Sequence, residues 1–167
     1  MNQVIKIGLK SHNMVKAINT YAIPLLSYSF GIIKWSDTEL QSLERKIRTL
    51  LTKNRMFHPK AAIERQVLPR MQGGRGITSI VWTHEKQVAN IREYFRKQEE
   101  KSKLRRVIMK ADNNLTVSNL RNTIENTKPE KKHYIEENRQ RWRNKVLHGR
   151  YPSILRKEEI NHSMSVL

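Results

Sequence analysis

The most apolar stretch of the chain runs from Ala17 to Trp35, and its hydrophobic positions recur at helical spacing. One face carries large apolar side chains at steps of four and three: Tyr21, Leu25, Tyr28, Ile32 and Trp35. Other apolar residues fill the flanks, and a helix that is hydrophobic around most of its circumference is normally buried. We therefore expect this stretch to form the core helix of the fold. Pro24 lacks a backbone N–H and crowds the preceding turn, which predicts a kink or short break within the helix.

The absence of charge between Lys16 and Lys34 raises the alternative that this stretch spans a membrane. The uncharged run is at the short end of what a bilayer requires, and it includes asparagine, threonine, proline and serine. We therefore expect a buried helix and no membrane partner.

A second helix is predicted directly after Trp35. Ser36 and Glu39 have the spacing of a capping box, in which each side chain bonds the backbone N–H of the other residue. Trp35 and Leu40 are placed to form a hydrophobic staple across this cap. We expect a sharp reversal here and a helix whose apolar side chains face the first one: Leu40, Leu43, Ile47, Leu50 and Leu51.

The same helix carries a basic stripe, with Arg45, Arg48 and Arg55 at helical steps and Lys46 beside them. Between Arg45 and Arg75 the sequence has nine basic residues, and Glu64 is the acid against them. Solvent-facing helices usually mix charges of both signs. The excess of one sign therefore predicts a surface for an anionic partner rather than a merely solvated face.

A glycine-rich stretch, Gly73-Gly74-Arg75-Gly76, follows the second helix and an extended segment. Three glycines around one arginine permit positive φ and a close approach of the backbone to a neighbour. That neighbour is either a phosphate held by backbone N–H groups or the next helix in a tight turn. We favour the turn, and take Gly74 and Gly76 as structural residues.

The rest of the chain is predicted to be helical as well. A long helix is expected from Ile77 to about Gln98, and an exposed charged helix over 92–110 that ends at Asp112. A short helix near 117–124 and a basic helix over 130–147 follow. The expected fold is all-α: a compact bundle with a short lead-in over residues 1–100, then an extended basic helical tail over 101–167 that looks truncated.

Composition narrows the chemistry. Lys and Arg number 33 and Asp and Glu 15, so the net charge of +18 favours a polyanionic partner, most commonly nucleic acid. The lack of cysteine excludes disulfides, thiol catalysis and cysteine-based zinc sites, and favours an intracellular protein. The aspartates are Asp37 and Asp112, and they do not form the clustered pair that two-metal nucleotidyl transfer needs. We expect no metal, no cofactor and no enzymatic activity of this chain by itself.

Several motifs, in order and spacing, resemble the region after the catalytic domain of non-LTR retrotransposon reverse transcriptases: AINTYAIPLLSYSFGIIKW, EL, HP, ER, LPR and GGRGI. The later RWRNKVLHGRYPSIL resembles the same lineage. The likeness is most specific over 16–80 and 141–155. It implies a thumb, a helical bundle that packs beside a polymerase palm and grips the template–primer duplex. The candidate nucleic-acid residues are Arg45, Lys46, Arg48, Arg55, Arg65, Arg70 and Arg75, with Arg139 and Arg143 in the tail; the candidate structural residues are Tyr21, Pro24, Trp35, Ser36, Glu39, Gly74 and Gly76.

The sequence departs from that family in lacking fingers, palm and the Tyr/Phe-Ala-Asp-Asp motif, which suggests a fragment or a degenerate copy. The expected function is therefore non-catalytic binding to the backbone of an RNA–DNA or DNA duplex, independent of base sequence. Two alternatives stay open, a helical protein–protein interaction module and a relic without selected function. A steep salt dependence of binding separates the first reading from a protein-binding module.

Overall fold

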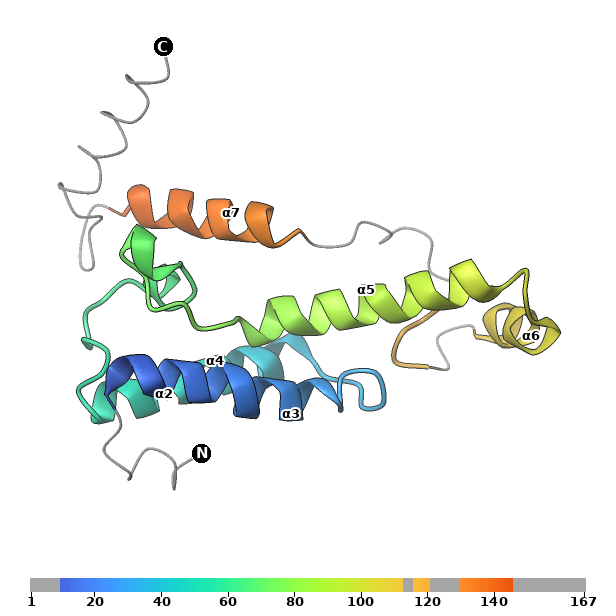
Figure 1. Cartoon of the computed structure of the whole chain (residues 1–167), viewed down its shortest axis with the longest axis horizontal. Coiled ribbons are helices and arrows are strands. Elements are labelled where there is room, and N and C mark those ends of the chain that lie inside the picture. Colours follow the sequence, from blue (N-terminus) through green and yellow to red (C-terminus); the bar gives the residue numbers. More distant parts are fainter. Residues whose placement is uncertain (1–9, 113–115, 121–129, 146–167) are drawn as a thin grey trace, which may run out of the picture. The chain divides into compact units, whose positions relative to one another are not determined.

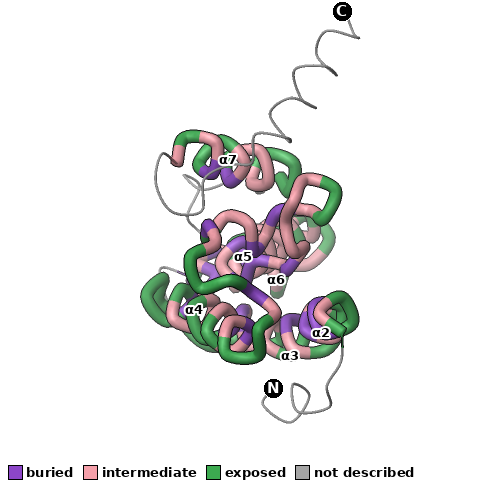
Figure 2. Tube along the Cα trace, turned by 90° about the vertical axis from the view of Figure 1, so that its left-hand side faces the viewer, coloured by how far each residue is buried: buried purple, intermediate pink, exposed green. Residues whose placement is uncertain are grey.

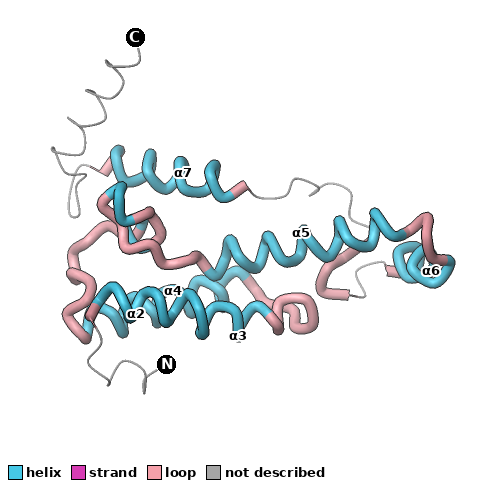
Figure 3. Tube along the Cα trace, in the orientation of Figure 1, coloured by secondary structure: helices cyan, strands magenta, loops and turns pink. Residues whose placement is uncertain are grey.

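The computed structural model describes residues 10–112, 116–120 and 130–145, and within these ranges the chain forms helices joined by turns, with no strand (Figure 3). The all-α expectation is confirmed. The chain divides into two compact units that interleave along the sequence. The α7 unit comprises residues 1–16, 47–77 and 131–167, and the α5 unit comprises 17–46 and 78–130. This division does not follow the sequence-based boundary at residue 100 between a bundle and a basic tail, which stays a prediction.

The predicted core helix is broken into three pieces. These are α2 (Ser11–Ala17), the π-helix η1 (Ile18–Ala22) and α3 (Ile23–Ser27), after which residues 28–33 form turns. Pro24 lies in the first turn of α3, immediately after the π-helix. Proline has no N–H that could donate to a carbonyl of the preceding turn. The wider hydrogen-bond spacing of the π-helix accommodates this missing bond. The predicted irregularity at Pro24 is confirmed, but the continuous helix to Trp35 is not.

The prediction that this segment is buried around most of its circumference is wrong for its face of large apolar side chains. Tyr21, Leu25, Tyr28 and Ile32 are between 73% and 80% exposed, whereas Ile18, Ile23 and Phe30 are nearly inaccessible to solvent. Figure 2 shows buried, intermediate and exposed residues following one another along α2 and α3. When apolar residues lie all around a helix, spacing does not identify which face is covered.

Within the described residues, no helix is long and apolar enough to cross a membrane.

The capping box is confirmed at the start of α4 (Asp37–Lys53). The backbone N–H of Ser36 donates to the Glu39 carboxylate at 2.8 Å, and the Glu39 N–H donates to the Ser36 hydroxyl at 3.3 Å. Trp35, just before the cap, packs edge-on against Phe30 and donates its indole N–H to the Ser29 hydroxyl. Buried Leu40, Ile47 and Leu51 confirm the predicted apolar face of the helix.

Ser36→Ala is expected to lower the free energy of unfolding by about 1 kcal/mol, because the Glu39 N–H loses its side-chain acceptor. Thermal melting followed by circular dichroism measures the change. Ser42→Ala within the same helix serves as the control, and an unchanged melting temperature for Ser36→Ala would contradict the capping role.

Both hydrogen bonds from Ser36, first that of the backbone and then that of the hydroxyl, hold the pKa of Glu39 below its ordinary value of 4.5. A carboxyl with a lowered pKa in the folded state stabilises the fold above its unfolded pKa. That contribution is lost as the pH falls through the folded pKa. The difference between wild type and Ser36→Ala is therefore expected to shrink in acid.

Helix α5 (Ile80–Gln98) begins at Ser79, whose hydroxyl accepts the Trp82 N–H, and not at Ile77 as predicted. A carboxylate from α4 completes this N-terminus. Glu44 accepts hydrogen bonds from the Ser79 hydroxyl at 2.5 Å and from the Ile80 and Val81 N–H groups at 2.7 and 3.3 Å. A negative charge at the positive end of the helix dipole stabilises the contact between Glu44 and the start of α5.

His84 lies on the packed side of α5, edge-on to Phe30 at 5.2 Å between ring centres. Burial lowers the pKa of His84, while Asp37 opposes this shift. Its Nε2 is buried without a hydrogen-bond partner among the described residues. The side chain thus serves as a packed ring of the α5 unit.

The charged stretch over 92–110 is not one continuous helix, because α5 ends within it at Gln98. α6 (Lys103–Ala111) is separate from α5, and Asp112 caps it as predicted. Buried Asp112 then accepts hydrogen bonds from Thr116 and from the Leu120 N–H. Residues 116–120 are turns, so the predicted helix near 117 does not begin there, and the rest of it lies outside the described residues.

The α7 unit is built around a loop and one helix. The loop contains two 3-10 turns, η2 (Glu64–Gln66) and η3 (Arg70–Gln72). α7 (Lys131–Arg143) packs along η2, as seen in Figure 1 beside the green segment. Trp142 is only 2% exposed and packs with Ala62, Leu68 and Ile135. Part of the predicted basic tail is therefore core.

Candidate nucleic-acid interface

The two units carry very different charge. The described ranges of the α7 unit, 10–16, 47–77 and 131–145, contain 15 Lys and Arg against three Glu. The described ranges of the α5 unit, 17–46, 78–112, 116–120 and residue 130, contain 12 Lys and Arg against nine Asp and Glu. The excess positive charge, and with it the attraction for a polyanion, therefore belongs mainly to the α7 unit.

The glycine-rich stretch is a tight turn whose backbone amides are all used. The N–H groups of residues 73–77 donate to carbonyls at 2.8–3.0 Å, among them those of Arg65, Gln66 and Leu68. A Cβ on Gly74 would lie 1.9 Å from the Leu68 carbonyl oxygen, so no other residue fits there without a shift of backbone. Gly76 has a φ of 73°. The turn is confirmed, and a phosphate held by these amides is excluded because they have no free N–H to offer.

The turn instead brings together the side chains of Arg65, Arg70 and Arg75, here called the arginine cluster. Arg65 Nε donates to the Gly73 carbonyl at 2.7 Å, and Arg70 donates to Nδ1 of His12 at 2.6 Å. Arg75 makes a long hydrogen bond of 3.5 Å to the Ser11 hydroxyl. All three partners are neutral acceptors.

The charges of Arg65 and Arg70 both act on Arg75. Burial lowers the pKa of Arg75 most, and the charges of Arg65 and Arg70 lower it further. The neighbouring acid, Glu64, is engaged elsewhere, in an ion pair of 2.8 Å with Lys145 of the same unit. The arginine cluster thus concentrates positive charge that its own contacts do not neutralise.

The predicted stripe on α4 is shorter than expected. Arg45 and Arg48 lie one turn apart, but the helix ends at Lys53 and Arg55 has a φ of 57°. The Met56 N–H bonds the Leu51 carbonyl and the Arg55 N–H bonds that of Thr52, which is a Schellman ending with arginine where glycine is usual. Arg55 therefore lies beyond the helix and is not part of the basic stripe on α4.

The α4 stripe is also divided between the units. Arg45 and Lys46 belong to the α5 unit, and Arg48 and Arg55 to the α7 unit. The structure thus gathers Arg65, Arg70 and Arg75 but not the whole predicted set.

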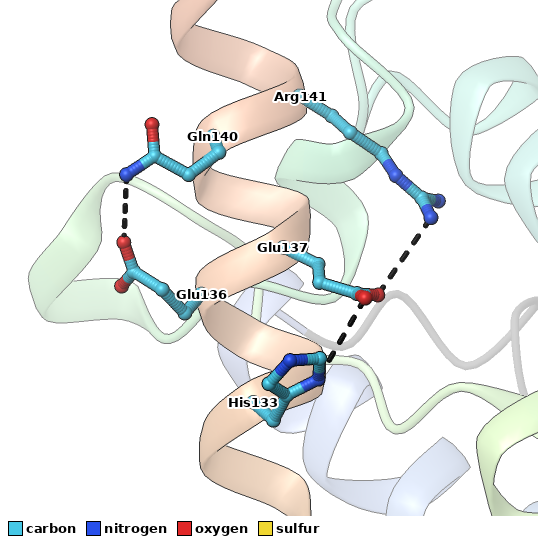
Figure 4. Close-up of a pocket in the computed structure, with 5 residues that line it drawn as sticks. All are labelled: His133, Glu136, Glu137, Gln140 and Arg141. Atoms are coloured by element: carbon cyan, nitrogen blue, oxygen red, sulfur yellow. Dashed lines mark hydrogen bonds and ion pairs between the residues drawn. The ribbon is translucent and has the colours of Figure 1, made fainter.

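On α7 the predicted residues meet acids. Arg139 is half-buried and pairs with Glu136 at 2.6 Å. Burial raises the pKa of Glu136, but hydrogen bonds from Gln140 and Arg139 and the charges of Arg139 and Arg143 outweigh it and lower that pKa. An open hollow of about 300 Å³ on this helix is lined by His133, Glu136, Glu137, Gln140 and Arg141. Figure 4 shows these five side chains. Its acids are already paired, Glu136 with Gln140 and Glu137 with His133 and Arg141. The hollow offers no further site.

Sequence reasoning missed Ser11 and His12, which meet Arg75 and Arg70 across a separation of about 60 residues, and Glu44 at the start of α5. No local pattern marks such pairs.

Among the described residues, no group of three or more histidine, cysteine, aspartate or glutamate side chains could hold a metal ion. In comparisons with family models, curated proteins and solved structures, nothing matches this chain.

Proposed function

We propose that the chain binds nucleic acid through the α7 unit, by contacts to backbone phosphates that do not depend on base sequence. The observation that carries this proposal is the unequal division of charge, 15 basic residues against three acids in the described part of the α7 unit. Binding of Lys and Arg to phosphates releases counterions from the nucleic acid, which favours association. Phosphate contacts position a protein without reading bases, so affinity should vary little with sequence.

The resemblance to non-LTR retrotransposon reverse transcriptases suggests a context for this binding. In that context the chain corresponds to a thumb and the linker after it, and its partners are a template–primer duplex and a polymerase palm. We expect no polymerase activity of this chain alone. Primer extension by the purified chain with magnesium or manganese would contradict that expectation.

Protein binding is a second candidate because of the exposed apolar residues Tyr21, Leu25, Tyr28 and Ile32. Large exposed apolar patches often mark interaction surfaces. A protein-binding function predicts little affinity for nucleic acid, whereas the proposed function predicts a steep loss of affinity with salt.

The decisive measurement is the salt dependence of duplex binding by fluorescence anisotropy. Each phosphate neutralised on a duplex contributes about −0.9 to the slope of log affinity against log salt. Replacing Arg65, Arg70 and Arg75 with glutamine is expected to weaken binding to every duplex equally and to flatten the slope by about 2 to 3 units. Replacing the same three with lysine should preserve the slope, because each charge is kept.

A matched control removes three charges from the α5 unit by replacing exposed Lys101, Lys103 and Arg106 with glutamine, and should leave the slope nearly unchanged. An equal loss in the control would show that only net charge matters. A larger loss on replacing Arg45, Arg48 and Arg55 would move the interface to these three residues instead.

A further inference from the structure

We infer that the arginine cluster is a binding site for a phosphate group, and that it prefers a terminal phosphomonoester of a nucleic acid to an internal phosphodiester. The inference rests on the proposed function for the source of the phosphate, whereas inorganic phosphate tests the site alone.

The first argument is unneutralised charge. Arg65, Arg70 and Arg75 hold a carbonyl, an imidazole nitrogen and a hydroxyl as their hydrogen-bond acceptors among the described residues. Arg75 also has a buried Nε without a hydrogen-bond partner among them. Gathering cations costs free energy unless an anion joins them, so an anion bound here stabilises the folded state.

The second argument is the supply of donors. A guanidinium has five N–H groups, and the contacts above use one on each arginine. The forks that remain match the oxygens of phosphate, to which arginine binds in a bidentate manner. Because the backbone N–H groups of residues 73–77 already donate to carbonyls, the arginine side chains supply the donors for phosphate.

The third argument concerns which phosphate fits. A phosphomonoester carries a charge of about −1.5 to −2 at pH 7 and three strong acceptor oxygens, as known for phosphorylated side chains. An internal phosphodiester has one charge and two unbridged oxygens. Three guanidinium groups are better neutralised by the monoester, so a phosphorylated strand end is the favoured ligand.

The backbone supports a preformed site. The Arg75 N–H bonds the Arg65 carbonyl at 2.8 Å, and the Gly73 N–H bonds the Arg70 carbonyl at 3.0 Å. His12 Nδ1 then accepts a hydrogen bond from exposed Arg70, since a guanidinium can only donate. The three arginines therefore belong to one hydrogen-bonded loop. The guanidinium groups of Arg70 and Arg75 are in addition hydrogen-bonded to residues of α2.

The first test melts the full chain in inorganic phosphate and in chloride at equal ionic strength. A site predicts a saturating rise in Tm, roughly 3–6 °C when phosphate is about tenfold above its Kd. Arg70→Gln should lose this rise, and in chloride it should melt no lower than wild type because one repelling charge is gone. Arg106→Gln, with the same charge change in the α5 unit, should keep the rise. Equal rises in wild type and Arg70→Gln would overturn the site, since phosphate stabilises many proteins by exclusion.

The second test compares duplexes of one sequence with 5′-phosphate or 5′-hydroxyl ends. Wild type should bind the phosphorylated duplex about tenfold more tightly, which is the size of one charge-assisted hydrogen-bonded pair. Arg70→Lys should lose this preference yet keep the salt slope, because lysine retains the charge without the fork. Equal affinity of wild type for both duplexes would overturn the preference for a terminal phosphate. A phosphate-dependent rise in Tm without salt-dependent duplex binding would uphold the site and contradict the proposed function.

Discussion

Phe30→Ala is expected to lower the free energy of unfolding of the α5 unit by about 3–5 kcal/mol. Phe30 is inaccessible to solvent and lies edge-on to both Trp35 and His84, at 6.2 and 5.2 Å between ring centres. Truncation removes the transfer free energy of the ring and the aromatic contacts, and it leaves a cavity beside His84. Urea unfolding followed by fluorescence of Trp35 and Trp82, both in the α5 unit, measures the loss.

Tyr28→Ala is the matched control for this experiment. Tyr28 is 78% exposed although the apolar segment that contains it was predicted to be buried, so its truncation should change stability by less than about 0.5 kcal/mol. A cost as large as that of Phe30→Ala would show that this face is covered in solution. The burial that the apolar spacing predicts for this segment would then be correct.

Glu44→Ala is expected to cost about 2–4 kcal/mol, the second largest effect. The carboxylate accepts hydrogen bonds from the Ser79 hydroxyl and from the N–H groups of Ile80 and Val81, all at the start of α5. Its removal leaves helix N–H groups without an acceptor and takes a negative charge from the positive end of the helix. Urea unfolding measured as for Phe30→Ala gives the magnitude.

Two further variants separate charge from hydrogen bonding at Glu44. Glu44→Gln keeps an acceptor oxygen and loses the charge, so about half of the destabilisation should remain. Glu93→Ala removes a carboxylate that pairs with Lys97 on the α5 surface, and it should cost less than about 0.5 kcal/mol. Equal costs for Glu44→Ala and Glu93→Ala would contradict the special role of Glu44 at the helix start.

Local patterns in the sequence were sufficient for several features. The Ser36–Glu39 capping box, the irregularity at Pro24, the end of α6 at Asp112 and the tight turn around Gly74 all depend on residues within a few positions of each other. Side-chain and backbone preferences over such distances act in the same way in almost any fold. The all-α class follows from the same helical spacing, summed along the chain.

Other features depend on residues that are distant in sequence, and only the tertiary structure decided them. The buried side of the Ala17–Trp35 segment depended on which neighbours cover it, because apolar residues occur all around it. The contacts of Glu44 with Ser79 and of His12 with Arg70 join positions 35 and 58 residues apart, for which spacing holds no information. The total positive charge is a property of composition, but its concentration in the α7 unit arises because folding brings residues 47–77 and α7 together. Repulsion among Arg65, Arg70 and Arg75 likewise follows from the turn that gathers them, since like charges interact through space and not along the chain.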